Sequence, residues 1–310
     1  MNTSSKLGQE IIDYQRDHSD KMTERLKAAE RLVQMAVEQY PDDQNFICAH
    51  DKWLEARLCV DEQAFVDEHI EKSNELLEKY AFSDQCKVCI STLQAKMYQV
   101  KGEYQKAEEI LENAIELCMQ TNKFWKFPKM GETFLQMIHV NIAEGSKGKV
   151  LHYAERHDKV QMLLIRFLKE QIKNKPNNAT VQEFAKHSIQ NAEEAMKEVE
   201  VLEMLARGEH KKAMKLAHKY LKDVGDGDTG FARVMHSMMV HLAHNKDWLV
   251  FLEAAEFVQP ELEKREHYRW LAQLIQNKIQ AHTEWADQSS AQIAKDELEA
   301  IRPFLLWDNL

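Results

Sequence analysis

The chain has 310 residues, of which 44% are hydrophobic, and it carries a formal net charge of −10 at pH 7. A chain of this length buries a sizeable core, but an acidic protein lacks the basic stripe that proteins use to neutralise a phosphate backbone, so we expect no nucleic-acid ligand. Glycine and proline number only 9 and 5, whereas helix-favouring residues abound. This composition predicts an all-α protein.

The first 21 residues are polar and lack the apolar core of a secretory signal peptide. No later stretch approaches 18 uninterrupted apolar residues, so we expect no membrane segment. The chain has five cysteines, an odd number that fits reduced thiols better than a disulfide framework. We therefore expect a soluble cytoplasmic protein.

Apolar residues recur three and four positions apart through most of the chain, which predicts twelve or thirteen helices. The first clear stripe covers residues 22–40 and stops at Pro41. Two further amphipathic helices are expected over 46–58 and 65–80. Each must bury its apolar side against a neighbour, and the short connections favour antiparallel hairpins.

Residues 95–117, AKMYQVKGEYQKAEEILENAIEL, contain the clearest repeat unit. We expect Gly102 to end one helix, Ala107 to let the next helix approach closely, and Tyr104 and Leu111 to fill the wedge between them. This pattern resembles the tetratricopeptide repeat. The resemblance implies a right-handed α-α superhelix, a solenoid of antiparallel helical hairpins.

Two weaker copies follow. Residues 201–221 place Gly208 and Ala213 at the equivalent positions, and Gly208 lies 106 residues after Gly102, close to three periods of about 34 residues. Residues 242–260 place Trp248 at the aromatic turn position but lack the glycine. Between the first two copies no repeat is legible, and the pattern there predicts helical hairpins of irregular length.

The expected organisation is a single solenoid over 1–310, with capping helices at 1–45 and 259–310 and helical repeats at 46–258. A flexible loop is expected at 225–230, and Pro260 is expected to open a long helix. The terminal solenoid repeat needs its open flank covered. We expect the apolar tail Phe304, Leu305, Leu306 and Trp307 to serve as that cap, with a docking peptide for a partner as the alternative.

No motif in the chain indicates catalysis, a cofactor or a metal. Cys86 and Cys89 form a lone C-x-x-C in a helical context, without a second pair at zinc-finger spacing. His241 and His244 share a helix face but lack the His-Glu-x-x-His pattern. No phosphate loop or nucleophile elbow is present. We expect no cofactor and no enzymatic activity.

The resemblance implies a protein-interaction module or scaffold of a regulatory kind. It would bind a peptide or a partner helix on a concave face formed by the first helix of each hairpin. The identity of that partner is not encoded in any motif, and homo-oligomerisation is left open. The peptide-binding positions expected from the two best copies are Thr92, Lys96, Gln99, Glu198, Leu202 and Leu205.

The alternative is a regulator that resembles the tetratricopeptide receptors of bacterial signalling peptides, in which peptide binding tightens the superhelix. Such receptors usually carry an additional N-terminal module. Residues before about 45 contain too few helices and too little basic charge for a DNA-reading module, so only the version with a protein-binding bundle fits.

Overall fold

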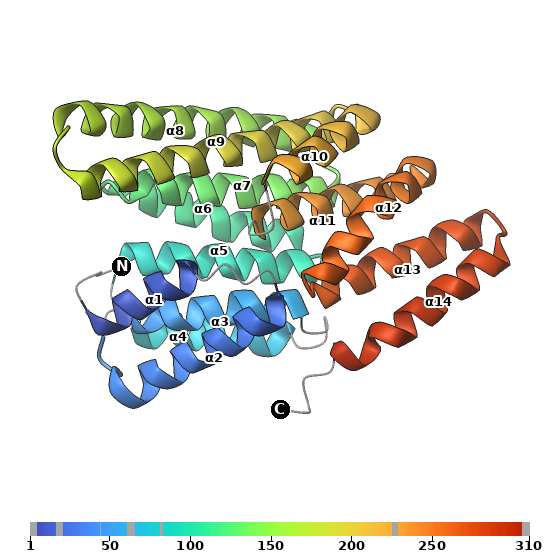
Figure 1. Cartoon of the computed structure of the whole chain (residues 1–310), viewed down its shortest axis with the longest axis horizontal. Coiled ribbons are helices and arrows are strands. Elements are labelled where there is room, and N and C mark those ends of the chain that lie inside the picture. Colours follow the sequence, from blue (N-terminus) through green and yellow to red (C-terminus); the bar gives the residue numbers. More distant parts are fainter. Residues whose placement is uncertain are drawn as a thin grey trace.

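The computed structural model describes residues 5–16, 21–43, 45–60, 66–80, 83–224 and 229–305. Within these ranges the regular structure is helical throughout, without a strand, which confirms the all-α class (Figure 1). The helices are α1 (Lys6–Arg16), α2 (Met22–Gln39), α3 (Phe46–Val60), α4 (Val66–Tyr80), α5 (Asp84–Val100), α6 (Tyr104–Gln120), α7 (Lys126–Glu144), α8 (Lys147–Asn174), α9 (Ala179–Ala206), α10 (His210–Val224), α11 (Thr229–His244), α12 (Trp248–Lys264), α13 (Tyr268–Glu284), α14 (Gln288–Ile301) and the 3-10 turn η2 (Arg302–Phe304).

The best repeat copy forms the hairpin α5–α6, and its small residues lie where the helices meet. Ala95, Ala107 and Leu111 are fully buried. In the second copy, Ala213 and Ala217 of α10 are buried in the same way. A pair of helices joined by a tight turn is therefore present at both places.

Six of the described helices end in the same way, with one residue in the left-handed backbone region. At the end of α5, Gly102 has φ +77° and donates its N–H to the Gln99 carbonyl (3.0 Å), while Glu103 donates to the Tyr98 carbonyl (2.9 Å). This pair of bonds is a Schellman motif, which satisfies carbonyls that the helix end leaves open. The six residues with positive φ are Gly102, Gly145, Gly208, Lys246, Glu266 and Ala286.

Three of these six turns carry a side chain where glycine is preferred. Lys246, Glu266 and Ala286 have φ between 55° and 56° and lie 20 residues apart, because α12 and α13 are each 17 residues long. A non-glycine residue in this conformation costs about 1–2 kcal/mol. The third repeat copy lacks glycine and is nevertheless closed by this turn, at Lys246.

One expectation about the start of a helix is corrected here. Pro260 lies inside α12, and α13 begins only at Tyr268. Proline lacks the N–H that a helix interior uses, yet α12 continues past Pro260 and ends at the left-handed turn at Glu266. Of the expected loop at 225–230, residues 229–230 belong to α11 and residues 225–228 lie outside the described residues, as do the tail residues 306–310. Of the tail, Phe304 stacks on Tyr268 of α13 with ring centroids 4.8 Å apart, and Leu305 is buried.

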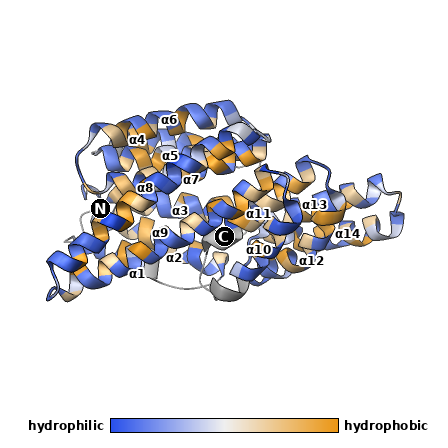
Figure 2. Cartoon of the chain, turned by 90° about the horizontal axis from the view of Figure 1, so that it is seen from above, coloured by the Kyte–Doolittle hydropathy of each residue, from blue (hydrophilic) through white to orange (hydrophobic). Residues whose placement is uncertain are grey.

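The hydrophobic residues gather where helices face one another, and hydrophilic residues cover the outside (Figure 2). One large buried cluster runs from Leu7 of α1 to Ala294 of α14. No helix in the described ranges combines the length and the apolar character needed to cross a bilayer.

The N-terminal helices α2 and α3 meet α13 and the turn before it, so the helices surround a central space. The N–H of Met22, at the start of α2, donates to the carbonyl of Arg265, 3.0 Å away in the turn between α12 and α13. In the same turn the Glu266 carboxylate accepts a hydrogen bond from the Thr23 hydroxyl and forms an ion pair with Lys21 (3.2 Å). Helix α3 packs against α13 beside this contact (Figure 1). The right-handed superhelix that the resemblance implies stays a prediction.

The left-handed turns give a first testable prediction. Replacing Ala286 by glycine removes the steric cost of a Cβ at φ 56°, so we expect Ala286→Gly to raise the free energy of unfolding by about 1 kcal/mol in chemical denaturation. The matched change Ala195→Gly, in the middle of α9, should lower it by about 1 kcal/mol. A loss of stability in both variants would contradict this account of the turn.

Candidate functional site

The central space contains a cavity of about 1170 Å³. Its walls come from α3, α5, α7, α11 and α13, and residues of α1, α2, α6, α9, α14 and η2 complete it. Most of the walls therefore come from alternate helices, each of which presents one side to the interior. A site for a drug-sized molecule occupies roughly 300–1,000 Å³, so this cavity is large enough for a longer ligand.

The cavity is basic although the chain is acidic. Among the described residues that line it, seven are lysine or arginine and three are aspartate or glutamate. The negative charge of the protein therefore lies mainly on its outside. The cations are Arg25, Lys52, Lys96, Lys101, Arg233, Arg269 and Arg302, and the carboxylates are Glu55, Glu132 and Glu299.

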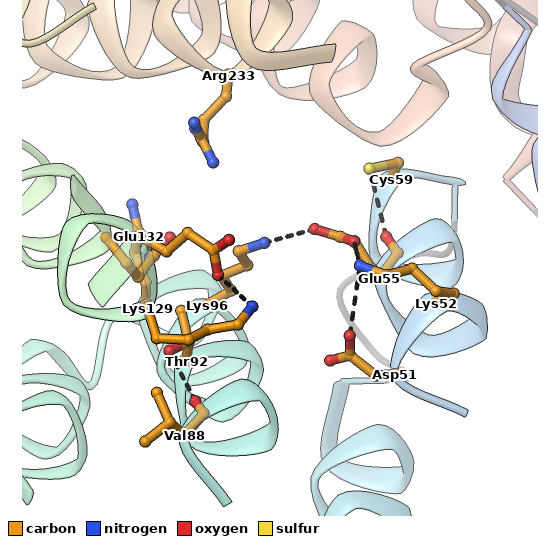
Figure 3. A network of polar contacts seen from close by, with 12 residues as sticks. Asp51, Lys52, Glu55, Cys59, Val88, Thr92, Lys96, Lys129, Glu132 and Arg233 are labelled. Atoms are coloured by element: carbon orange, nitrogen blue, oxygen red, sulfur yellow. Dashed lines mark hydrogen bonds and ion pairs between the residues drawn. The ribbon is translucent and has the colours of Figure 1, made fainter. Parts of the chain in front are cut away.

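On one side of the cavity the lysines are held by carboxylates (Figure 3). Glu55 of α3 bonds to Lys96 of α5 (2.8 Å) and to Lys52 (3.0 Å). These two ammonium groups, Lys52 first, hold the pKa of Glu55 well below its usual value. Arg233 of α11 lies opposite, and its guanidinium points across the cavity toward this network (Figure 3). We call the side formed by α3 and α5 the lysine wall.

The opposite side, formed by α11 and α13, carries a stack of three rings. The Trp270 indole lies between the imidazoles of His236 (centroids 4.8 Å apart) and His267 (4.6 Å), nearly parallel to both. Burial, reinforced by nearby arginines, lowers the pKa of His236 to about 4 and that of His267 to about 3. Both imidazoles are therefore neutral at pH 7. We call this side, with Arg233 and Arg269, the arginine wall.

Three buried nitrogen atoms beside the arginine wall have no hydrogen-bond partner within the described residues: Nε2 of His139, Nδ1 of His267 and Nε1 of Trp270. All three side chains line the cavity. His139, of α7, is fixed through its other nitrogen, Nδ1, which lies 2.7 Å from the Ser237 hydroxyl. Buried polar groups without a partner are rare in native proteins, so these three nitrogen atoms are candidates for hydrogen bonds to a ligand.

Of the six positions expected from the sequence, two line the cavity. Lys96 and Gln99 of α5 lie on the inner surface, where the Gln99 amide donates to the His139 carbonyl (3.2 Å). Thr92 does not contribute, because its hydroxyl donates to the Val88 carbonyl of its own helix (2.9 Å). A role for Lys96 and Gln99 in peptide binding stays a prediction.

The other three positions, on α9, are placed differently. Leu202 and Leu205 are 0% and 1% exposed, so the expectation that they line an open groove is wrong. They occupy the same register before Gly208 as Lys96 and Gln99 do before Gly102, but α9 packs against α7, α8, α10 and α11 and is covered. Glu198 is not a lining residue, and it accepts a hydrogen bond from Arg233 (2.9 Å).

The arginine wall was not expected from the sequence. One signal was present: between residues 229 and 245 the helix is largely apolar, and Arg233 is its one lysine, arginine, aspartate or glutamate. A charge held in such a segment usually has a specific partner or role. Nothing local to the sequence indicates that Trp270 and Arg269 lie near it, because they belong to a different hairpin.

No group of three potential metal ligands converges anywhere in the described part of the chain. Cys86 and Cys89 lie together in α5 as free thiols. Comparison with protein-family models finds no match, and no curated protein matches the chain either.

The neutral histidines give a second prediction, on pH dependence. Burial first, and then the nearby charges of Arg265, Arg25 and Arg269, keep the folded pKa of His267 at about 3, below the unfolded value of about 6.5. The unfolded chain therefore binds the extra proton first, and stability should fall as the pH drops from 6.5 toward 3.

We expect His267→Phe, which keeps a stacked ring but cannot be protonated, to reduce this loss. Urea denaturation at pH 7, 6, 5 and 4 measures it: the slope of the unfolding free energy should be shallower by up to about 1.4 kcal/mol per pH unit than in the unmodified protein. Parallel slopes for the two proteins would show that His267 is not held neutral.

Proposed function

We propose that this protein is a protein-interaction module that holds a segment of a partner polypeptide in its central cavity. The observation that carries the proposal is the cavity itself, which has a volume of about 1170 Å³, opens to solvent and has walls from helices near both ends of the chain. A module of this kind acts by binding and needs no turnover. The resemblance of the α5–α6 hairpin to the tetratricopeptide repeat supports the same role.

The chemistry of the cavity also favours a polypeptide. Five amide side chains line it: Gln99, Gln136, Asn191, Gln273 and Gln276. An amide group offers both donors and an acceptor, so it can pair with the N–H and C=O groups of an extended backbone.

The closure contact favours a second candidate, a peptide-responsive regulator. Lys21 and Thr23 meet Glu266 across the two ends of the helical array, so a ligand between the walls could change how tightly the ends hold together. Small-angle scattering with a bound peptide tests this candidate. A change in the radius of gyration would support it, and an unchanged radius at saturation would leave binding without a conformational response.

We place the protein in the cytoplasm as part of this proposal. The five cysteines are free thiols in the structure, and free thiols are typical of a reducing compartment.

A third prediction tests the cavity as the binding site. Gln276 lines the cavity and is exposed on α13, so Gln276→Trp should obstruct the cavity without disturbing the core. Gln105, exposed on α6 and absent from the lining, provides the matched control Gln105→Trp. The probe is a displayed library of random dodecapeptides.

Peptides selected on the unmodified protein should bind Gln105→Trp with equal affinity and bind Gln276→Trp at least tenfold more weakly, as measured by fluorescence anisotropy. Equal binding to all three proteins would place the site outside the cavity. A library that yields no binder would remove the proposal.

A further inference from the structure

Two of the five cysteines meet at the starts of packed helices. Cys48 is the third residue of α3, Cys86 is the third residue of α5, and α3 packs against α5. The Cys48 thiol donates a hydrogen bond to the Cys86 sulfur. Both cysteines are free thiols in the structure. The two sulfur atoms are therefore in contact without a covalent bond between them.

The surroundings of Cys86 favour its thiolate form. Ser83 caps α5: its hydroxyl oxygen accepts a hydrogen bond from the Cys86 N–H (3.3 Å), and its hydroxyl donates to the Cys86 sulfur (3.2 Å). The start of a helix also carries a partial positive charge, which stabilises an anion there. The hydrogen bond from Cys48 first, and then that from Ser83, outweigh burial and the Asp51 carboxylate and lower the pKa of Cys86 to about 6. Cys86 is therefore largely a thiolate at pH 7.

The other four cysteines lack this activation. The hydrogen bond to Cys86 and burial raise the pKa of Cys48, so Cys48 stays a protonated thiol. Burial raises the pKa of Cys59 to about 11 and that of Cys118 to about 12, and it also raises the pKa of Cys89. A reactive thiolate in contact with a second thiol is the arrangement in which an oxidised sulfur is converted into a disulfide.

We infer that Cys86 is a site of reversible oxidation by small hydroperoxides and that Cys48 is the thiol that resolves the oxidised Cys86 into a disulfide. Cys86 is 7% exposed, which favours a reagent as small as hydrogen peroxide over a bulky disulfide. Neither cysteine lines the cavity, so the inference does not depend on the proposed binding of a polypeptide.

The oxidation takes two steps. The Cys86 thiolate attacks one oxygen of hydrogen peroxide: the S–O bond forms, the O–O bond breaks, and the leaving hydroxide takes a proton to become water. The Cys48 thiol then gives up its proton and attacks the sulfenic sulfur of Cys86: the S–S bond forms, and the S–O bond breaks to release a second water. Two electrons pass from the sulfurs to the peroxide, and a dithiol reductant reverses the change. The disulfide would join α3 to α5, the two helices of the lysine wall.

Mapping of the oxidation products tests the inference. The folded full-length protein is treated with hydrogen peroxide at pH 7, blocked with N-ethylmaleimide and digested with trypsin without reduction. Trypsin places the five cysteines in five different peptides, and cleavage after Lys87 separates Cys86 from Cys89. Mass spectrometry should show peptide 80–87 linked to peptide 32–52, through Cys86 and Cys48, and dithiothreitol should abolish the link. A link from Cys86 to another cysteine, or no link, would overturn the inference.

Cys59 provides a matched control within the same molecule, because it is more exposed than Cys86 but is not activated. Cys86 should lose its thiol to peroxide at least about tenfold faster than Cys59, since the thiolate is the reactive form. In guanidinium chloride the two rates should converge. Equal rates in the folded protein, or a faster Cys59, would show that exposure alone controls the oxidation and would overturn the inference.

Substitutions separate the two roles. In Cys48→Ser the resolving thiol is gone, so the sulfenic acid of Cys86 should persist and form an adduct with dimedone. Cys86→Ser should abolish the fast oxidation, and Cys59→Ser should behave like the unmodified protein. Absence of the dimedone adduct in Cys48→Ser would contradict the assignment of Cys48 as the resolving partner.

Ser83 gives a readout that is specific to activation. Ser83→Thr keeps both the helix cap and the hydroxyl donor, whereas Ser83→Asp keeps a cap but puts a negative charge in place of the donor. The rate of Cys86 alkylation by iodoacetamide should be half-maximal near pH 6 in the unmodified protein and in Ser83→Thr, and at a higher pH in Ser83→Asp. An unchanged midpoint in Ser83→Asp would show that Ser83 does not stabilise the thiolate and would overturn this part of the account.

Discussion

The arrangement of the helices around the cavity depends on the contact between α2 and the turn that joins α12 to α13. It consists of one backbone hydrogen bond, from Met22 to Arg265, and the interactions of a single carboxylate, Glu266, with Lys21 and Thr23. Glu266 is also the residue that ends α12 in the left-handed conformation. Glu266 therefore both turns the chain after α12 and connects this turn to the start of α2. The helices between these two points surround the cavity.

Closure also determines the electrostatics of the cavity. It brings Arg25 of α2 and Lys52 of α3 into the same enclosure as Arg269 of α13, more than 200 residues away along the chain. Like charges gathered in this way repel one another, and neighbouring carboxylates offset that repulsion: Glu55 pairs with Lys52 and Lys96, and Glu198 pairs with Arg233.

The local structure was largely predictable from the sequence, because helical periodicity and a few glycines report directly on backbone conformation. The turns at Gly102 and Gly208 can be predicted because glycine is favoured at positive φ, and both hairpins were located from these two glycines. The turns at Lys246 and Ala286 have the same conformation without a glycine, so the sequence does not show where the repeats near them turn. Pro260 was misread as a helix start because proline is favoured in the first turn of a helix and disfavoured in the interior, whereas here it lies inside α12.

The site was much less predictable. Lys96 and Gln99 were placed on the inner surface from one hairpin alone, but the same register on α9 led to Leu202 and Leu205, which are buried by neighbouring helices. The arginine wall depends on how α11 and α13 stack and on the closure of the array. Both are contacts between residues far apart in sequence, which periodicity does not report.

Zero-length cross-linking with a water-soluble carbodiimide tests the closed arrangement most directly. This reagent joins an amine to a carboxylate only when the two are in contact, and it should form an amide between Lys21 and Glu266, whose charged atoms lie 3.2 Å apart. Mass spectrometry of digested monomer should show that linked peptide alongside the Lys246–Glu284 pair (3.0 Å), which serves as the internal control. Formation of the control link without the Lys21–Glu266 link would contradict the closed ring and the enclosed cavity built on it.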